Sequence, residues 1–391
     1  MEQRQILGKN HWYHETQSSL CPADALPLVP EAAHADRFLL DLTLSPQQLA
    51  EEHSWINAAR TAGQTLLPEN VTVTRLHTLS SYDRLSTALT VAQVCGVQRM
   101  CNHYAARLAP QPGPDSSRES NQRLTQITQY ARQLASQPTL IDSTSRTHLD
   151  EVGLSVDDMV TFNQLIGFIG FQARAIAVWQ ALQGLPVRWL PGLDTLQDAA
   201  VELFSAEGAD WAADLPPVEL RYAQAEQLEA VSVSQPLGPL QGMHWLLAHD
   251  AHALNGLSQL IRLLWQPAPG QSGEQKLVMM LTARINGSPA CFAQAAQQWG
   301  EENGLPEAMR NGERALQAWS HNHPRERAVI QAVQLLTRAP DRFSAAHIQP
   351  LFDHGFTPSQ VLRLLVSAGL FGWVNRLKIG LGTLVQPSRL G

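Results

Sequence analysis

The chain has 391 residues, of which 44% are hydrophobic, so it can bury a large core and has room for two domains. Its net charge of −7, from 35 acidic and 28 basic residues, gives no general attraction for nucleic acid. No basic amphipathic segment indicates a membrane surface, and the first ten residues lack the apolar core of a signal peptide. Four scattered cysteines are too few for a disulfide scaffold, so we expect a cytoplasmic protein with reduced thiols.

Helices are predicted along the chain, because apolar residues recur with a period near 3.6 and no segment shows sustained strand-like alternation. Val329, Ala332, Val333 and Leu336, for instance, fall on one helix face. The expected fold class is therefore all-α. Residues 1–75 match no other part of the chain and form an N-terminal extension that the pattern leaves unassigned.

Residues 76–190 and 241–391 contain the same motifs in the same order. An offset of 202 residues pairs Pro138 with Pro340, Leu149 with Leu351, Gly153 with Gly355, Ser155 with Thr357, Gly170 with Gly372 and Arg174 with Arg376. The match needs no gap over roughly 40 residues, which chance rarely supplies. Two copies of one helical module are therefore predicted, joined by a linker at 191–240 that is rich in proline and glycine.

The first group of matched residues predicts the same helix junction in both repeats. Gly153 and Gly355 suit the residue after a helix, where the backbone needs a positive φ. Ser155 and Thr357 follow at once as N-caps, since their hydroxyls can accept a hydrogen bond from an unpaired backbone N–H. Each repeat should therefore end one helix and start the next at this point.

The helix after this junction is the most apolar part of the chain. Leu165–Leu182 is interrupted by three polar residues, so no membrane span is predicted. Gly170 and Gly372 cost a helix about 1 kcal/mol each relative to alanine, which suggests a close helix–helix approach at that point in both repeats. Arg174 and Arg376 suit favourable contacts with backbone carbonyls near a helix C-terminus.

A second matching block precedes the first in each repeat, at 92–101 and 283–291. An offset of 190 pairs Cys101 with Cys291, whereas an offset of 191 pairs Gly96 with Gly287. Residue similarity favours 191. The choice matters, because it decides which residue of the first repeat corresponds to Cys291.

The repeated order of these motifs resembles the carboxymuconolactone decarboxylase/AhpD alkylhydroperoxidase family, over about 80–190 and 245–385. The resemblance implies two tandem AhpD-like helical domains that form an intrachain pseudo-dimer, and further assembly into a homo-oligomer. The implied activity is thiol-dependent reduction of a small hydroperoxide, with a thiol reductant as partner and with neither a cofactor nor a metal.

The hydroperoxidase branch of the family uses Cys-x-x-Cys, a histidine four residues further on and an upstream glutamate, because the thiolate that attacks the peroxide needs a proton relay. Carried onto the second repeat, this pattern places Ser288 at the first cysteine and Cys291 at the second. Ala295 stands at the histidine position and Lys276 at the glutamate position, with Glu274 two residues away. The second repeat therefore keeps one cysteine of the relay.

The first repeat keeps even less of this pattern. With Cys101 as the reactive cysteine, Gln98 takes the resolving position and Ala105 the histidine position. His103 is near in sequence, but residues at i and i+2 of a helix point in different directions. With the offset of 191, Met100 takes the reactive position. The candidate catalytic residues of the chain are Cys291, Cys101, Glu274 and His103.

Two interpretations of these residues stay open. Cys101 and Cys291 are either reactive thiols or small buried residues; Pro289 could start a helix at whose N-terminus Cys291 would be activated. Cys95 is expected to be a core residue rather than a resolving thiol. The alternative function is a non-redox family member, either a decarboxylase-like acid/base enzyme or a small-molecule-binding protein that has lost the relay.

The densest group of histidines lies at 244–252. His249 and His252 are three residues apart and could share a metal ion, but two ligands make a poor site. We expect this segment to be a helix at the mouth of a pocket in the second repeat.

Overall fold

The computed structural model describes residues 30–187, 195–205, 210–265, 272–299 and 303–385. Within these ranges the chain forms sixteen α-helices, several short 3-10 turns and one sheet of two short strands, which confirms the all-α fold class. Cys21 lies outside the described residues.

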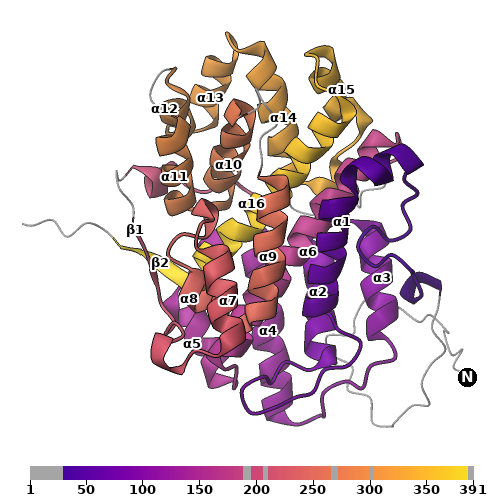
Figure 1. The fold of residues 1–391 in the computed structure, drawn as a ribbon, viewed down its shortest axis with the longest axis vertical. Helices are drawn as coiled ribbons and strands as arrows, with labels where there is room; N and C mark the ends of the chain where they lie inside the picture. Colours follow the sequence, from indigo (N-terminus) through magenta and orange to yellow (C-terminus); the bar gives the residue numbers. More distant parts are fainter. Residues whose placement is uncertain (1–29, 188–194, 206–209, 266–271, 300–302, 386–391) are drawn as a thin grey trace, which may run out of the picture.

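The helices of the two repeats follow one another in the same order (Figure 1). Those of the first repeat are α2 (Ser81–Cys95), α3 (Gln98–Leu108), α4 (Arg118–Ser136), the turn η3 (Pro138–Leu140), α5 (Ser143–Glu151) and α6 (Val156–Leu182). Their counterparts in the second repeat are α10 (Ser272–Asn286), α11 (Pro289–Trp299), α14 (Pro324–Arg338), the turn η8 (Pro340–Arg342), α15 (Ala345–Asp353) and α16 (Pro358–Leu381). Two further helices, α12 (Leu305–Arg310) and α13 (Glu313–Ser320), lie between α11 and α14.

The remaining elements come from the N-terminal extension, the linker, the first part of the second repeat and the C-terminal end. They are η2 (Pro30–Ala32), α1 (Pro46–Leu66), η4 (Val201–Phe204), β1 (Asp210–Ala213), η5 (Leu220–Tyr222), α7 (Ala225–Ser234), η6 (Gly238–Leu240), α8 (His244–Leu247), η7 (Ala248–Asp250), α9 (Ala251–Leu264) and β2 (Gly382–Val385). Helix α1 packs beside α9, where a methyl group at Gly256 would lie 3.2 Å from Cβ of Ala62. The described residues of the N-terminal extension, 30–75, thus contribute to the core.

Helices α6 and α16 lie at the centre of the molecule (Figure 1). Both are buried along most of their length, and most of their buried residues are apolar, which is typical of a helix surrounded by other elements. By length and composition alone either helix could cross a membrane, but 89% of the apolar window of each is buried inside the protein. Their apolar surfaces are therefore covered by the protein itself.

The close approach of α6 and α16 occurs one helical turn before the predicted position. A methyl group at Gly167 would lie 2.0 Å from Cδ1 of Trp373, and one at Gly369 would lie 3.4 Å from Cδ2 of Phe171. These two contacts are reciprocal, because the offset of 202 converts one pair into the other. At Gly170 no neighbouring helix comes within 4 Å of such a methyl group, whereas at Gly372 Asn286 and Thr282 of α10 lie 3.8 and 4.0 Å from it.

The group nearest to Gly170 and to Gly372 is an arginine of the same helix. Nη1 of Arg174 donates to the Gly170 carbonyl at 2.9 Å, and Nη1 of Arg376 donates to the Gly372 carbonyl at 3.0 Å. A methyl group at either glycine would lie 3.5 or 3.3 Å from that guanidinium. The paired glycines therefore give the arginines room to fold back along their own helices.

The same arginines also bind the opposite repeat. Nη2 of Arg174 donates to the Thr337 carbonyl at 2.6 Å, in the last turn of α14. Arg376 donates to the carbonyls of Leu134 and Ala135 at 3.1 and 3.0 Å, in the last turn of α4. Burial, with a contribution from the nearby Arg174, lowers the pKa of Arg376 to about 9. The predicted carbonyl contacts are confirmed, but each arginine caps a helix of the other repeat.

The helix junctions follow the sequence prediction closely. Gly153 and Gly355 have φ of 85° and 82°. Ser155 and Thr357 cap α6 and α16, each within a reciprocal capping box. These bonds fix where the two central helices begin.

The corner between α2 and α3 settles how the upstream blocks correspond. Gly96 and Gly287 have φ of 69° and 82°, and each ends the matching helix of its repeat. Only the offset of 191 pairs them. Cys291 therefore corresponds to Met100 in the first repeat, and Cys101 corresponds to Phe292.

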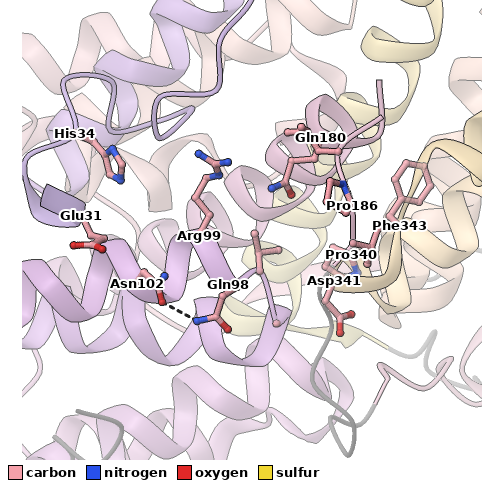
Figure 2. Close-up of a pocket in the computed structure, with 14 residues that line it drawn as sticks. Glu31, His34, Gln98, Arg99, Asn102, Gln180, Pro186, Pro340, Asp341 and Phe343 are labelled. Atoms are coloured by element: carbon pink, nitrogen blue, oxygen red, sulfur yellow. Dashed lines mark hydrogen bonds between the residues drawn. The ribbon is translucent and has the colours of Figure 1, made fainter. Parts of the chain in front are cut away.

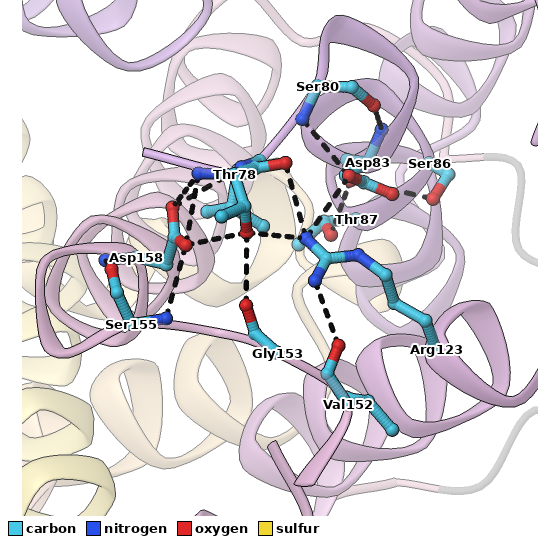
Figure 3. Close-up of polar contacts among 11 residues, drawn as sticks. Thr78, Ser80, Asp83, Ser86, Thr87, Arg123, Val152, Gly153, Ser155 and Asp158 are labelled. Atoms are coloured by element: carbon cyan, nitrogen blue, oxygen red, sulfur yellow. Dashed lines mark hydrogen bonds and ion pairs between the residues drawn. The ribbon is translucent and has the colours of Figure 1, made fainter. Parts of the chain in front are cut away.

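Asp158 of the α6 cap also joins two distant segments (Figure 3). Its buried carboxylate accepts hydrogen bonds from the backbone N–H groups of Thr78, Leu79 and Ser155 at 2.8 to 3.2 Å. The Thr78 hydroxyl donates to the same carboxylate at 2.6 Å and accepts from Arg123 at 2.9 Å. The entry to α2 is thus held on the start of α6.

Two local features differ from the prediction. Residues 244–252 do not form one helix, since α8 ends at Leu247, the turn η7 follows, and α9 begins at Ala251. Strands β1 and β2 pair antiparallel, with Ala213 opposite Gly382, although no strand was expected there. A side chain at Gly382 would lie 2.2 Å from the Ala212 carbonyl oxygen, which explains the glycine.

Candidate functional site

The larger of two cavities beside α3 has a volume of about 580 Å³, within the size range of about 300 to 1,000 Å³ that is usual for small-molecule sites. We call it the arginine cavity. Its walls are the segment 34–38, the C-terminal half of α1, the α3 residues Tyr104 and Arg107, and Phe168 of α6. The wall contributed by α1 and 34–38 belongs to the N-terminal extension, which the sequence left unassigned.

Three arginines line this cavity, and they differ in how they are neutralised. Arg60 donates from Nε and Nη2 to one oxygen of Asp36, at 3.2 and 2.6 Å, so its charge is matched. Arg37 forms an ion pair with Glu69, whose side chain is 68% exposed. Arg107 forms no ion pair among the described residues.

Arg107 is the most isolated charge of the cavity. It is 9% exposed, and among the described residues its one hydrogen bond runs to the Leu67 carbonyl at 3.5 Å, the long limit for such a bond. Burial lowers the pKa of Arg107 and the neighbouring Arg37 lowers it further, while Tyr104 and the carboxylate of Glu69 act in the opposite direction. The guanidinium stays charged near neutral pH, because arginine starts from a very high pKa. A buried cation is therefore left without a direct carboxylate partner among the described residues.

Aromatic rings form the apolar side of the arginine cavity. The rings of Phe38 and Phe168 lie 6.1 Å apart between centroids, and Phe168 fills the space that a side chain at Gly63 would need. Leu67 adds a further apolar side chain. The cavity thus combines guanidinium groups with an apolar floor.

One buried glutamine holds this wall in place. The Tyr104 hydroxyl donates to Oε1 of Gln172 at 2.5 Å. Nε2 of Gln172 donates to the carbonyls of Arg37 and Phe38 at 2.9 and 2.8 Å. Gln172 therefore fixes the segment that carries Arg37 against α3 and α6.

A second cavity of about 410 Å³ lies at the N-terminal end of α3, and we call it the polar cavity (Figure 2). Gln98 and Asn102 face it but bond to each other at 2.7 Å, while Arg99 donates to the Leu40 carbonyl. Asp341, from the second repeat, borders it, and burial raises the pKa of this carboxyl group. Gln98 and Asn102 thus occupy each other, and charged side chains of both signs line the cavity.

Cys101 is placed for packing rather than for attack on a substrate. Its side chain is buried, and burial raises the pKa of the thiol to about 12, with nearby Cys95 adding to the rise. At neutral pH the thiol is therefore protonated, whereas the nucleophile is the thiolate. Cys95, Cys101 and Cys291 are all buried free thiols.

His103 points toward the N-terminal segment. Its Nδ1 donates to the Glu31 carbonyl at 2.8 Å, its ring lies 5.4 Å from that of His34, and its Nε2 has no hydrogen-bond partner among the described residues. Burial lowers the pKa of His103 to about 4, so the ring is neutral at physiological pH. No hydrogen bond in the described part of the chain joins it to Cys101.

Cys291 is the third residue of α11, which begins at Pro289 as predicted. The thiol is buried, and it lies close enough to Lys378 of α16 for its charge to raise the pKa of that amine, although burial lowers this pKa overall. Lys378 lies 4.4 Å above the ring of Trp211. A cysteine and a buried amine thus come together in the second repeat, which the sequence did not predict.

Glu274 has a different partner from the one that a relay needs. Its Oε1 accepts a hydrogen bond from Nε of Arg325 in α14 at 3.0 Å. Lys276, at the position of the relay glutamate, donates to the Gln298 carbonyl. Among the described residues no hydrogen bond joins Glu274 to Cys291. The relay expected from the resemblance is not assembled by these contacts.

The histidines of 244–252 face different neighbours. His249 contacts Asp157 at 3.3 Å and the Pro216 carbonyl at 2.9 Å, while His252 lies 3.8 Å from Glu226 at the surface. Neither lines the arginine cavity or the polar cavity. In the described part of the chain, no three His, Cys, Asp or Glu side chains are grouped so that they could hold a metal ion.

Comparison with known proteins adds no further assignment: no protein-family model matches the chain, and no curated protein matches it. The resemblance to the carboxymuconolactone decarboxylase/AhpD family therefore rests on the repeat and its motifs. The activity that it implies stays a prediction.

Proposed function

We propose that this protein binds a small molecule in the arginine cavity and is a non-redox member of the AhpD-like group, acting as a binding protein or an acid/base enzyme. The observation that carries the proposal is Arg107, a buried cation that borders a cavity and lacks a carboxylate partner among the described residues. Proteins rarely bury an unpaired charge, because its desolvation is costly. A ligand that enters the cavity would relieve that cost.

The state of the first-repeat residues supports a function without a thiol. Cys101 is protonated at neutral pH, and the neutral His103 is bound to a backbone carbonyl. A peroxidase of the implied kind needs a thiolate and a proton relay. Neither is formed by the contacts around α3.

The proposal retains the architecture that the resemblance implies, with two AhpD-like domains as a pseudo-dimer within one chain. The reciprocal contacts of Gly167 with Trp373 and of Gly369 with Phe171 support it, because a two-fold axis produces contacts in such pairs. The crossed bonds of Arg174 and Arg376 support it in the same way. A cytoplasmic location and further homo-oligomerisation belong to the same proposal.

A ligand-observed NMR screen of small fragments against the full chain tests the proposed function. Gln64 lines the cavity from an exposed position on α1, so Gln64→Trp should block it without disturbing the core. Thr61→Trp, at an exposed position of the same helix outside the lining, is the matched control. We expect fragments that bind wild type and Thr61→Trp but not Gln64→Trp. Equal binding to all three proteins would contradict the proposal.

A second candidate function is favoured by Cys291 alone. The observations that favour it are the position of Cys291 in the first turn of α11 and the neighbouring amine of Lys378. Thiol-dependent reduction of a hydroperoxide should then disappear in Cys291→Ser and persist in Cys101→Ser. Peroxide turnover that is unchanged in Cys291→Ser would rule out this candidate.

A further inference from the structure

We propose that the ligand of the arginine cavity is an organic monoanion, a carboxylate carried by an aromatic or short aliphatic body. This inference rests on the proposed function, because it assigns a chemical class to the molecule that the same cavity would bind. It is carried by the charges that line the cavity and by the apolar surface beside them.

The charge balance of the lining favours a single negative charge. Three arginines line the cavity with two carboxylates, those of Asp36 and Glu69, which leaves one positive charge. His34 also lines it, but any charge on that ring is matched by Asp41, to which it is hydrogen-bonded. A monoanion would complete the balance.

The unmatched charge belongs to Arg107. Arg60 is engaged by Asp36 and by Asn57, so its donors are occupied. Among the described residues, the donors of Arg107 form only the long contact with the Leu67 carbonyl. Arg37 stands beside Arg107 and is paired with Glu69. The guanidinium of Arg107 is thus the available one, and it presents a planar fork that fits a carboxylate.

The shape of the cavity limits the rest of the ligand. Phe38 and Phe168 provide aromatic surface in the cavity that Arg107 lines, and Leu67 provides aliphatic surface. At about 580 Å³ the cavity can enclose a body of the size of one ring with a short chain. A carboxylate without an apolar body would leave the apolar lining of the cavity in contact with water. An uncharged body would leave Arg107 without a carboxylate partner.

Isothermal titration calorimetry on the full chain with two matched probes tests the assignment. The probes are 4-phenylbutyrate and 4-phenylbutyramide, which share a body and differ in charge. We expect the carboxylate to bind at least about ten-fold more tightly, the effect of one charge-assisted hydrogen bond. Equal affinity, or tighter binding of the amide, would overturn the assignment.

Variants of Arg107 connect this preference to the proposed residue. Arg107→Gln should weaken binding of the carboxylate by roughly ten- to hundred-fold and leave the affinity for the amide unchanged. Arg107→Lys should retain part of the preference, since it keeps a charge without the fork. Arg118→Gln, which removes an exposed arginine that lines neither cavity, is the control. Circular dichroism establishes that each variant is folded.

The outcomes separate this inference from the proposed function. If both probes bind equally to wild type and Arg107→Gln, and Gln64→Trp abolishes their binding, the anionic class is wrong and the small-molecule site stands. If phenyl phosphate binds more tightly than the carboxylate, a phosphate monoester replaces the monocarboxylate. If neither probe binds, the inference fails, and the fragment screen alone decides the proposed function.

Discussion

Replacing Gly167 with alanine should show how tightly the two central helices are packed. The new Cβ would lie 2.0 Å from Cδ1 of Trp373 and 2.7 Å from its Cγ and Nε1, closer than any two such atoms can approach. The indole is buried and cannot move alone, because its Nε1 donates to Oε1 of buried Gln164 at 2.9 Å. The helices must separate or the ring must rotate, and either movement strains this bond.

The expected loss of stability follows from three contributions. Overpacking a core costs about 1 to 3 kcal/mol. Loss of the hydrogen bond between the Trp373 indole and the Gln164 amide costs about 1 to 3 kcal/mol. The higher helix propensity of alanine returns about 1 kcal/mol. We therefore expect Gly167→Ala to lower the free energy of unfolding by about 3 kcal/mol.

Urea unfolding, followed by circular dichroism and tryptophan fluorescence, measures this loss. Gly170→Ala is the matched control, because its methyl group would meet only Nη1 of Arg174, at 3.5 Å, and it should be neutral or slightly stabilising. In a Trp373→Leu background the cost of Gly167→Ala should shrink, since the clashing ring is gone. A Gly167→Ala protein within about 0.5 kcal/mol of wild type would refute the reasoning, as surface substitutions fall in that range.

Three further predictions concern buried polar groups. Asp158→Ala should destabilise the protein by about 3 kcal/mol or more in urea unfolding, because at least three backbone donors lose a charged acceptor. Asp158→Asn should cost less, because the amide keeps one acceptor oxygen. Equal stability of wild type and Asp158→Ala would contradict this prediction. Cys101 should resist iodoacetamide at pH 7.4 in the native protein and react after unfolding, as mass spectrometry of the labelled peptides would show; rapid native labelling would contradict its raised pKa. His103 has a folded pKa of about 4, below its unfolded value, so the unfolded chain binds the extra proton first and stability should fall as pH drops from about 6.5 to 4. His103→Gln should reduce this loss in urea titrations at pH 7 and 4.5, and an unchanged pH dependence would argue against a neutral buried ring.

The parts of the fold that could be predicted from the sequence depend on local chemistry. The left-handed backbone at Gly153 and Gly355 and the caps at Ser155 and Thr357 are set by the residues themselves and their nearest neighbours. A residue that accepts φ > 0, followed by a hydroxyl, leaves few alternatives to a helix end and a helix start. Because the sequence repeats, a junction predicted in one half of the chain is also predicted at the matching position of the other half.

The roles of the other paired residues depend on tertiary contacts and could not be predicted. Gly167 and Gly170 look alike in the sequence, but one faces Trp373 and the other faces an arginine of its own helix. A glycine inside a helix shows that space is needed without showing what fills it. For the same reason Arg174 was expected to bind carbonyls, but not those of the other repeat.

The candidate site was missed because its residues come from unrelated parts of the chain. Arg37 lies in the unassigned extension. Arg107 lies in α3, where the motif match concerned Cys101 and gave no reason to select an arginine. One signal was available, since Gln172 is a polar residue in the most apolar stretch of the chain, and all its side-chain bonds hold the wall of the cavity. A buried amide in such a helix indicates a backbone segment that must be held in place.

The crossed arginine bonds bear on how such a chain can diverge. In a symmetric homodimer every substitution at a shared interface appears on both subunits, so a change that suits one face is imposed on the other. Here Arg174 and Arg376 are separate positions of one chain, and each can be kept while its surroundings change independently. The helices α12 and α13 and the amine of Lys378 occur on one side, and the arginine cavity occurs on the other. One repeat can therefore acquire new features while the arginine of the other repeat still caps the end of one of its helices.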